Sequence, residues 1–306
     1  MVKAARQAQA VPWPGKVALV LVGATAVLLA VGAVVNPMGA SLACPDWVFL
    51  PTCDGKVFPP MVGGVLFEHG HRLWATLVGM LTVVVALGAW GGGDRTTRVL
   101  GLVAVGLVVL QGTLGGVTVL LKLHPLVSTL HLVTAFAFLC LTLELAHRLG
   151  GLGSLATFPY APRRLARATL GVAFLQVALG GAVRHMGAAM ACGIDWIGCG
   201  PAWWPSHGLG HLHMTHRLVG YLLAAKVLLL CARAHGRARG TVQRMWAWLP
   251  TGLVAAQVVL GWLSVASLRS VAWVVLHTCG AVLLVGVLFL FEKASDEPKR
   301  SEGQGV

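Results

Sequence analysis

Charge is scarce in this sequence. Of its 306 residues, 11% are Asp, Glu, Lys or Arg, and only 10 are acidic. Soluble domains carry charge on roughly a quarter of their residues. The length alone would suggest a soluble protein of two domains, but this composition excludes that class of protein. Hydrophobic residues instead make up 57% of the chain, and several apolar runs reach the roughly 20 residues that cross a bilayer as a helix. The sequence therefore predicts an integral membrane protein embedded in a lipid bilayer.

The formal charge of +13 does not indicate a nucleic-acid partner, because the basic residues gather in alternate connections between the apolar runs. The intervening connections carry little beyond Lys56, Lys122 and Arg269. Basic connections favour the cytoplasmic side, so we expect a multi-pass protein of the cell (plasma) membrane with cytoplasmic termini. The basic connections contain Lys3, Arg6 and Lys16; Arg95 and Arg98; Arg148, Arg163, Arg164 and Arg167; Arg233, Arg237, Arg239 and Arg244; and Lys293, Lys299 and Arg300.

The apolar runs predict eight membrane-spanning helices. The first follows a basic start, as a signal peptide does, but it is longer than a usual signal core, so we expect a retained helix. Residues 151–167 are predicted to form a solvated cytoplasmic linker, and residues 293–306 a disordered cytoplasmic tail. The expected spans are Val17–Val35, Val62–Trp90, Val99–Leu121, Leu126–His147, Ala168–Gly187, His207–Arg233, Met245–Ser267 and Val271–Glu292.

The spacing of histidines and cysteines indicates an internal repeat. His71 and His131 are 60 residues apart, and His216 and His277 are 61 apart. Each first histidine follows a cysteine, by 18 residues in one half and 17 in the other. Four helices per half is an even number, so both halves enter the membrane from the same side. We predict an all-α fold of two pseudo-symmetric, parallel four-helix bundles, residues 1–150 and 168–292.

A glutamine-glycine motif recurs along the chain and adds to the impression of a repeat. It occurs in Gln111–Gly116, in Gln176–Gly181 and, more faintly, in Gln257–Gly261.

The four histidines are candidate haem ligands. Two imidazoles at matching depth on neighbouring helices can bind one iron from both sides. A single histidine within a span more often hydrogen-bonds a neighbouring helix, but four at matching repeat positions favour ligation. Zinc is the competing metal; it takes a local cluster of Cys, His or carboxylate ligands, whereas the long-range pairing of these histidines suits a planar cofactor.

Glu68 lies three residues before His71, so both side chains share one helix face. A carboxylate beside a cofactor in low dielectric can hold or release a proton, or stabilise a developing cation. Alternatively, Arg72 simply neutralises it. The residue at the matching position is His213, so we hypothesise that the N-terminal half is reactive and the C-terminal half only carries electrons.

Arg72 and Arg217 each follow a candidate ligand at the polar boundary. Guanidinium groups bind carboxylates in a forked geometry, so these residues could pair with haem propionates; equally, they could extend to the membrane interface.

Two cysteine pairs lie in loops predicted to face the outside, where disulfides form. The pairs are Cys44–Cys53 and Cys192–Cys199. We favour structural disulfides over a thiol–disulfide step during cofactor handling, because no feature of the sequence indicates a lowered thiol pKa.

These residues, in this order and spacing, resemble the bacterial haem A synthase family over essentially all eight helices. The first cysteine pair is spaced more widely than in the family pattern, and His69, His211 and His213 blur the ligand assignment; no role follows for His124 either. The matching features are the Cys44/Cys53 loop, Glu68-x-x-His71-Arg72, His131, the Cys192/Cys199 loop, His216-Arg217 and His277.

The resemblance implies oxidation of the C8 methyl of haem O to a formyl group, giving haem A for terminal oxidases, with water as the oxygen source. It implies that His71 and His131 hold the substrate haem and that His216 and His277 hold a haem B. Glu68 would be the acid/base or cation-stabilising group. Implied partners are a haem O synthase and a membrane electron acceptor such as a quinone.

Two other classes of function remain in view. A b-type cytochrome that passes electrons across the membrane needs haems near opposite faces, whereas all four candidate ligands here are predicted to lie toward one face. A haem-binding transporter would also explain an internal repeat with glycine-rich helices.

Overall fold

The computed structural model describes residues 11–47, 51–152, 159–200 and 203–295. These residues form eight α-helices and one short 3₁₀ helix, with no β-strand among them. All eight α-helices are long and apolar enough to cross a membrane, which confirms the predicted all-α membrane fold. The helices are α1 (Trp13–Val35), α2 (Gly63–Gly92), α3 (Arg95–Leu120), α4 (Pro125–Arg148), α5 (Arg163–His185), η2 (Ala188–Met190), α6 (Gly208–His235), α7 (Thr241–Ala266) and α8 (Val271–Ala294).

Several helix ends differ from the sequence prediction: α1, α3 and α7 each begin four residues before the expected span, and two further ends bear on the predicted linker and tail. Helix α5 begins at Arg163, directly after Pro162, so it includes residues that we expected in the linker. Arginine favours helix and its long side chain can reach the polar boundary, so basic residues there do not stop the helix. Helix α8 continues to Ala294, two residues beyond the expected span, and the rest of the predicted tail (296–306) lies outside the described residues.

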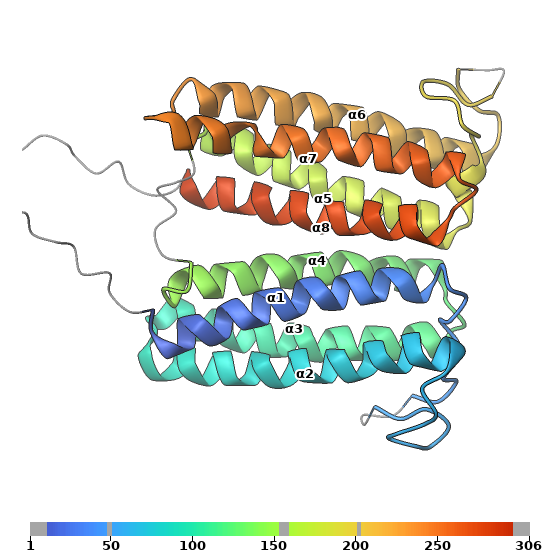
Figure 1. The fold of residues 1–306 in the computed structure, drawn as a ribbon, viewed down its shortest axis with the longest axis horizontal. Helices are drawn as coiled ribbons and strands as arrows, with labels where there is room; N and C mark the ends of the chain where they lie inside the picture. Colours follow the sequence, from blue (N-terminus) through green and yellow to red (C-terminus); the bar gives the residue numbers. More distant parts are fainter. Residues whose placement is uncertain (1–10, 48–50, 153–158, 201–202, 296–306) are drawn as a thin grey trace, which may run out of the picture.

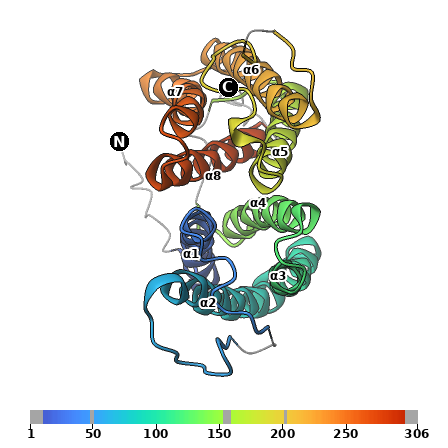
Figure 2. The ribbon, with the colours of Figure 1, turned by 90° about the vertical axis from the view of Figure 1, so that its right-hand side faces the viewer.

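The helices form two groups of four, α1–α4 and α5–α8 (Figure 1). Viewed along the helices, α1, α4, α5 and α8 meet in the middle, while α2 and α3 lie at one edge and α6 and α7 at the other (Figure 2). The start of α1 and the end of α8 lie at one end of the molecule, and the two cysteine loops lie at the opposite end (Figure 1). The first span is therefore an integral part of the first group.

Two acidic residues of the helices, Glu144 and Glu292, are buried and paired at the end opposite the cysteine loops. Glu144 of α4 accepts from Arg148 at 2.6 Å, and Lys293 of α8 lies 3.1 Å from it. Glu292 accepts from Arg167 of α5 at 2.7 Å. Buried charges need such partners. The Glu144–Lys293 pair joins α4 to α8 across the two groups, and the Glu292–Arg167 pair joins α5 to α8 within the second group.

Both predicted disulfides are present. Cys44 is bonded to Cys53, and Cys192 to Cys199, so each long loop is closed on itself close to the start of α2 or α6. A disulfide lowers the conformational entropy of the unfolded chain, so a loop that it closes loses less entropy when it becomes ordered at the end of the helix bundle.

Candidate functional site

Each group of four helices encloses a cavity toward its disulfide-loop end. We call them the N-terminal cavity, of about 680 Å³ within α1–α4, and the C-terminal cavity, of about 570 Å³ within α5–α8. Both volumes are typical of sites that bind a small molecule or cofactor. His71 and His131 line the first cavity, and His216 and His277 line the second. The structure thus brings together the two members of each predicted histidine pair.

Every one of these histidines lies against a glycine of the preceding helix. A Cβ atom at that glycine would touch the imidazole, and in three of the four cases it would come closer than most Cβ atoms approach a neighbour. Glycine therefore leaves room for the ring in a closely packed interior, most clearly at Gly32, Gly180 and Gly261. The glycine and histidine pairs, with the distance from an ideal Cβ to the imidazole Cε1, are Gly32 and His71 (3.0 Å), Gly115 and His131 (3.5 Å), Gly180 and His216 (3.0 Å), and Gly261 and His277 (3.2 Å).

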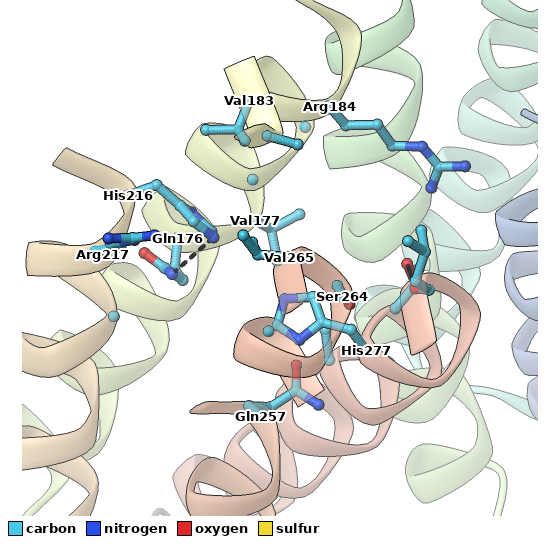
Figure 3. Close-up of a pocket in the computed structure, with 18 of the residues that line it drawn as sticks. Gln176, Val177, Val183, Arg184, His216, Arg217, Gln257, Ser264, Val265 and His277 are labelled. Atoms are coloured by element: carbon cyan, nitrogen blue, oxygen red, sulfur yellow. Dashed lines mark hydrogen bonds between the residues drawn. The ribbon is translucent and has the colours of Figure 1, made fainter. Parts of the chain in front are cut away.

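The recurring glutamine-glycine motif belongs to this arrangement. Gln111, Gln176 and Gln257 each lie one turn before the glycine that faces a histidine. The side chain of Gln176 approaches His216, with 3.4 Å between their Nε2 atoms (Figure 3). Gln176 lies on α5, however, and only Gln111 on α3 and Gln257 on α7 occupy matching helices. The motif therefore marks histidine environments and is not a simple measure of the repeat.

The amides of Gln111 and Gln257 support the histidines of α4 and α8. Gln111 is hydrogen-bonded to Thr134. When the amide is oriented so that its oxygen accepts from the Thr134 hydroxyl, its nitrogen donates to Nδ1 of His131 at 3.1 Å. When the amide of Gln257 is oriented so that its oxygen accepts from a backbone N–H of α8, its nitrogen donates to the backbone oxygen of His277 at 2.9 Å. These bonds hold the second histidine of each pair in a fixed position, and Figure 3 shows His277 and His216 facing the same space.

The residues present fit a haem held by two imidazoles. The Nδ1 atoms of His71 and His216 are buried without a hydrogen-bond partner in the described protein, but so are those of His69 and His147, which line neither cavity. The fit therefore rests on the imidazoles that share each cavity. Each cavity is lined by three imidazoles: the predicted pair, on two different helices, and one more, His185 in the N-terminal cavity and His213 in the C-terminal cavity. Haem iron accepts two such ligands, which the predicted pair can supply. In the described ranges, no group of three or more His, Cys, Asp or Glu side chains could hold a metal ion by itself.

Glu68 lines the N-terminal cavity and also anchors the first cysteine loop. It is 5% exposed; its Oε2 accepts from the backbone N–H of Cys44 at 2.9 Å, and its Oε1 accepts from Arg72 at 2.8 Å. Arg72 donates further to the backbone oxygens of Cys44, Asp46 and Thr52, each at 2.7 Å. All four terminal N–H groups of Arg72 are thereby used.

The second half anchors its loop in the same way with different chemistry. His213 stands at the position that matches Glu68, and its Nδ1 accepts from the backbone N–H of Cys192 at 3.3 Å. Arg217 donates to the backbone oxygens of Gly193, Asp195 and Gly198 at 2.6–2.8 Å. At this matching position a carboxylate lines the N-terminal cavity and an imidazole lines the C-terminal one, as the sequence predicted. The C-terminal cavity is also lined by the carboxylate of Asp195.

The extra histidines support loops. His69 and His211 each contact a backbone oxygen of their own loop, at Val57 and Pro205 respectively, with 2.8 Å to the ring Nε2. His207 is the N-cap of α6 and accepts from Gly210 at 3.0 Å. These contacts explain why histidines crowd the starts of α2 and α6.

Two residues of α5 belong to the site and were not found from the sequence. Arg184 lines both cavities. It donates to the backbone oxygen of Ala33 at 3.0 Å and lies 3.4 Å from Oδ1 of Asn36. Figure 3 shows its side chain directed toward the group α1–α4. His185 lines the N-terminal cavity although it lies on a helix of the other half, and Thr129 is 3.1 Å from its Nδ1. The only signal was a basic pair at a helix end, which is ordinary at a membrane interface.

The fold and the two cavities define a multi-pass membrane protein with a pair of imidazoles in each half. The chain belongs to the COX15-CtaA family of cytochrome oxidase assembly proteins, whose sequence model matches residues 62–289.

Curated relatives match most of the chain and most of their own length. A protein of Symbiobacterium thermophilum, named heme A synthase, is 35% identical over 245 residues, covering 74% of this chain and 78% of the relative. A protein of the same name from Bacillus licheniformis is 25% identical, covering 85% of this chain and 88% of the relative. Another from Shewanella oneidensis is 28% identical, covering 89% of this chain and 94% of the relative. The family resemblance expected from the sequence is confirmed.

Proposed function

We propose that this protein is a haem A synthase, an oxidoreductase that converts the C8 methyl group of haem O into the formyl group of haem A. The observation that carries the proposal is the N-terminal cavity, where His71, His131 and the buried carboxylate of Glu68 line one space of suitable size. Conversion of a methyl group to a formyl group with water as the oxygen source releases four electrons and four protons. The site must therefore hold the ring, accept protons and pass electrons on.

In this proposal His71 and His131 hold the substrate haem, and His216 and His277 hold a haem B that relays electrons. The haem iron supplies the one-electron redox chemistry when it is bound. The protein fixes the imidazoles through the glycines and glutamines that face them. Glu68, held by Arg72 and the Cys44 N–H, can accept a proton released near the methyl group or stabilise positive charge on the carbon.

Arg184 is better placed to bind haem propionates than Arg72 or Arg217. The guanidinium groups of Arg72 and Arg217 are largely used by backbone oxygens of the loops. Arg184 faces both cavities and forms no ion pair with a carboxylate in the described part of the chain. A guanidinium group in this position matches a carboxylate ligand in charge and geometry.

The positive-inside pattern supports an orientation with both termini in the cytoplasm and the cysteine loops outside. The electrons would then leave near the outer leaflet to a membrane acceptor such as a quinone, and the substrate would come from a haem O synthase in the same membrane. Both cavities lie toward the same end of the helices, which disfavours the alternative of a b-type cytochrome that carries electrons across the bilayer.

Mass analysis of extracted haems tests the proposal. Protein purified from cells that make haem O should contain haem B together with haem O or haem A. Glu68→Gln should retain its haem but accumulate haem O, because the amide can still accept from Cys44 but cannot take up a proton. His213→Gln, the matched change in the other half, should still form haem A. Haem A formation at the wild-type level in Glu68→Gln would remove Glu68 from the mechanism; protein without any haem would contradict the proposed function.

A further inference from the structure

The N-terminal cavity reaches the outer surface of the molecule between α2 and α3. Several residues that line it are also exposed, on the edge that faces away from the other group of helices (Figure 2). Met80 of α2 is 57% exposed, and Val109 of α3 is 60% exposed. In a membrane this edge faces lipid, so the cavity has a side opening to the bilayer. The exposed residues that line this opening are Thr76, Met80, Val83, Val109, Gly112 and Thr113.

The matching side of the C-terminal cavity is covered. Positions on α2 and α6 match at a separation of 145 residues, and those on α3 and α7 at 146. Trp262 stacks on Trp196 with 5.0 Å between ring centroids, and Tyr221 is hydrogen-bonded to the backbone of Trp196. Three lining positions of the N-terminal cavity carry a smaller residue than their match: Thr76 for Tyr221, Gly79 for Ala224 and Gly112 for Val258. Gly116 matches Trp262, but Trp47 occupies the space beside it. At Met80 and Val109 the matching residues, Ala225 and Ala255, are the smaller ones.

The N-terminal cavity also extends further along α2 and α3 than the C-terminal cavity does along α6 and α7. On α2 its lining continues to Val83, whereas on α6 the described lining of the other cavity ends at Leu223, which matches Val78. Five helical residues correspond to about 7 Å of additional length, at roughly 1.5 Å per residue. The additional wall consists of the side chains of Met80, Val83 and Val105. It is an apolar groove that continues directly from the histidine pair.

We propose that this groove between α2 and α3 binds the isoprenoid chain of the substrate haem, and that Gly79 and Gly112 give it the necessary width. The inference rests on the proposed function. Haem O differs from haem B in having a farnesyl-derived chain in place of a vinyl group, so a site that prefers haem O must recognise that chain. The groove supplies apolar contacts, and its opening allows the chain to enter from the lipid.

The two glycines leave space that a side chain would fill. A Cβ atom placed on Gly79 or Gly112 meets no other described atom within 4 Å. Both glycines line the cavity, so this free space belongs to the groove. Ala224 and Val258 occupy the matching positions in the second half, which under the same proposal holds a haem without the long chain.

The test transfers these two side chains to the N-terminal half. The variant is Gly79→Ala/Gly112→Val. Ferric haem O is titrated into protein whose C-terminal cavity is already filled, and binding is followed by the Soret band. The affinity for haem O should fall by about tenfold or more, because a few methylene groups of the chain would no longer be buried. The affinity of the same cavity for haem B should stay within about twofold. Gly106→Val is the matched control, because Gly106 also has open space at its Cβ and is not part of the described lining.

Three results separate the possibilities. An equal loss of haem O and haem B affinity, or unchanged haem O affinity, would overturn the groove assignment while leaving the proposed function intact. Wild-type protein that binds neither haem in this cavity would instead contradict the proposed function. If the double variant does not fold, the reciprocal change Ala224→Gly/Val258→Gly tests the proposal. The C-terminal cavity of this variant should retain haem O as well as haem B after purification. If this cavity still excludes haem O, the proposal is overturned.

Discussion

The two halves of this protein hold their histidines in the same way but differ around them. In both halves a glycine of the preceding helix makes room for each imidazole, and an arginine after the first histidine holds the disulfide loop. The halves differ in the residue that anchors the start of the loop, in the outer wall of the cavity, and in the contribution of α5, which places Gln176 beside His216 and His185 in the lining of the N-terminal cavity. We expect the shared features to bind a planar cofactor, and Glu68 and the wall between α2 and α3 to separate the chemistry of the two halves.

The tryptophan over each cavity illustrates this difference. In the C-terminal half Trp262 belongs to α7 and donates to the backbone oxygen of Ile194 at 3.0 Å. In the N-terminal half the matching residue is Gly116, and Trp47 of the cysteine loop fills the space, so that a Cβ on Gly116 would lie 1.9 Å from its ring. A loop can move without breaking a helix. The N-terminal cavity is therefore covered by a side chain of a loop, and the C-terminal cavity by a side chain of a helix.

The largest predicted effects concern the glycines that face the first histidine of each half. Gly32→Leu should displace His71 and remove haem from the N-terminal cavity, and Gly180→Leu should do the same at His216, because neither site has room for a side chain. Each change should lower haem content by about half, with the remaining haem in the other cavity. Absorbance at the Soret band relative to protein measures this loss.

Gly23→Leu is the control for both changes, because no described atom lies within 4 Å of a Cβ at Gly23. Loss of both haems in Gly32→Leu and in Gly180→Leu would show that the cavities are not independent, and full retention would contradict the role of the glycines.

A smaller but more specific effect is expected from exchanging the loop anchors. Glu68→His gives the N-terminal half the anchor of the C-terminal half, so the loop should stay in place through the Cys44 N–H while conversion of haem O falls by about a hundredfold or more, the usual range for loss of an acid/base group. The Soret band should persist. The reverse change, His213→Glu, should leave conversion within about threefold, and a comparable loss there would show that the two anchors are equivalent.

Much of this fold followed from patterns that physical rules make unambiguous. Apolar runs of sufficient length specify membrane helices, and the positions of His71, His131, His216 and His277 indicated which helices meet around a cavity. The cysteine pairs were correctly predicted because short loops allow only one pairing within each loop.

Other features could not be predicted because they depend on contacts between distant segments. Gly32 and Gly180 are ordinary glycines in the sequence, and only the packing of α1 on α2 and α5 on α6 shows that each faces an imidazole. Arg184 resembled an interfacial arginine, although it lies between the halves and lines both cavities. Arg72 was considered as a partner of a cofactor carboxylate, whereas its N–H groups are used by the loop.

The disulfides should contribute moderately and unequally. Removing Cys192–Cys199 by a double change to serine should destabilise the protein by about 2 kcal/mol, the typical contribution of a short closed loop. Removing Cys44–Cys53 should cost less, because Arg72, Glu68 and Asp46 continue to hold that loop. Thermal unfolding in detergent measures both, with Cys279→Ser, which changes a free cysteine, as the control. A larger loss for the first disulfide would show that the ion pair and the hydrogen bonds add little.

The smallest effect, and the one most specific to the first loop, concerns Asp46. Although partial burial opposes ionisation, hydrogen bonds from the Gly55 N–H, the Thr52 hydroxyl and the Asp54 N–H hold the pKa of this carboxyl below its usual value. A lowered pKa means that the ionised form stabilises the folded loop at pH values above about 4, the usual pKa of aspartate, and that this contribution is lost as the pH falls through the lowered value. In Asp46→Asn, reduction of Cys44–Cys53 by a phosphine should be roughly threefold faster at pH 6, as expected for partly exposed hydrogen bonds, with the difference from wild type vanishing near pH 2. Reduction of Cys192–Cys199 in the same sample should not change. A difference that is the same at both pH values would mean that the shape of Asp46, and not its charge, supports the loop.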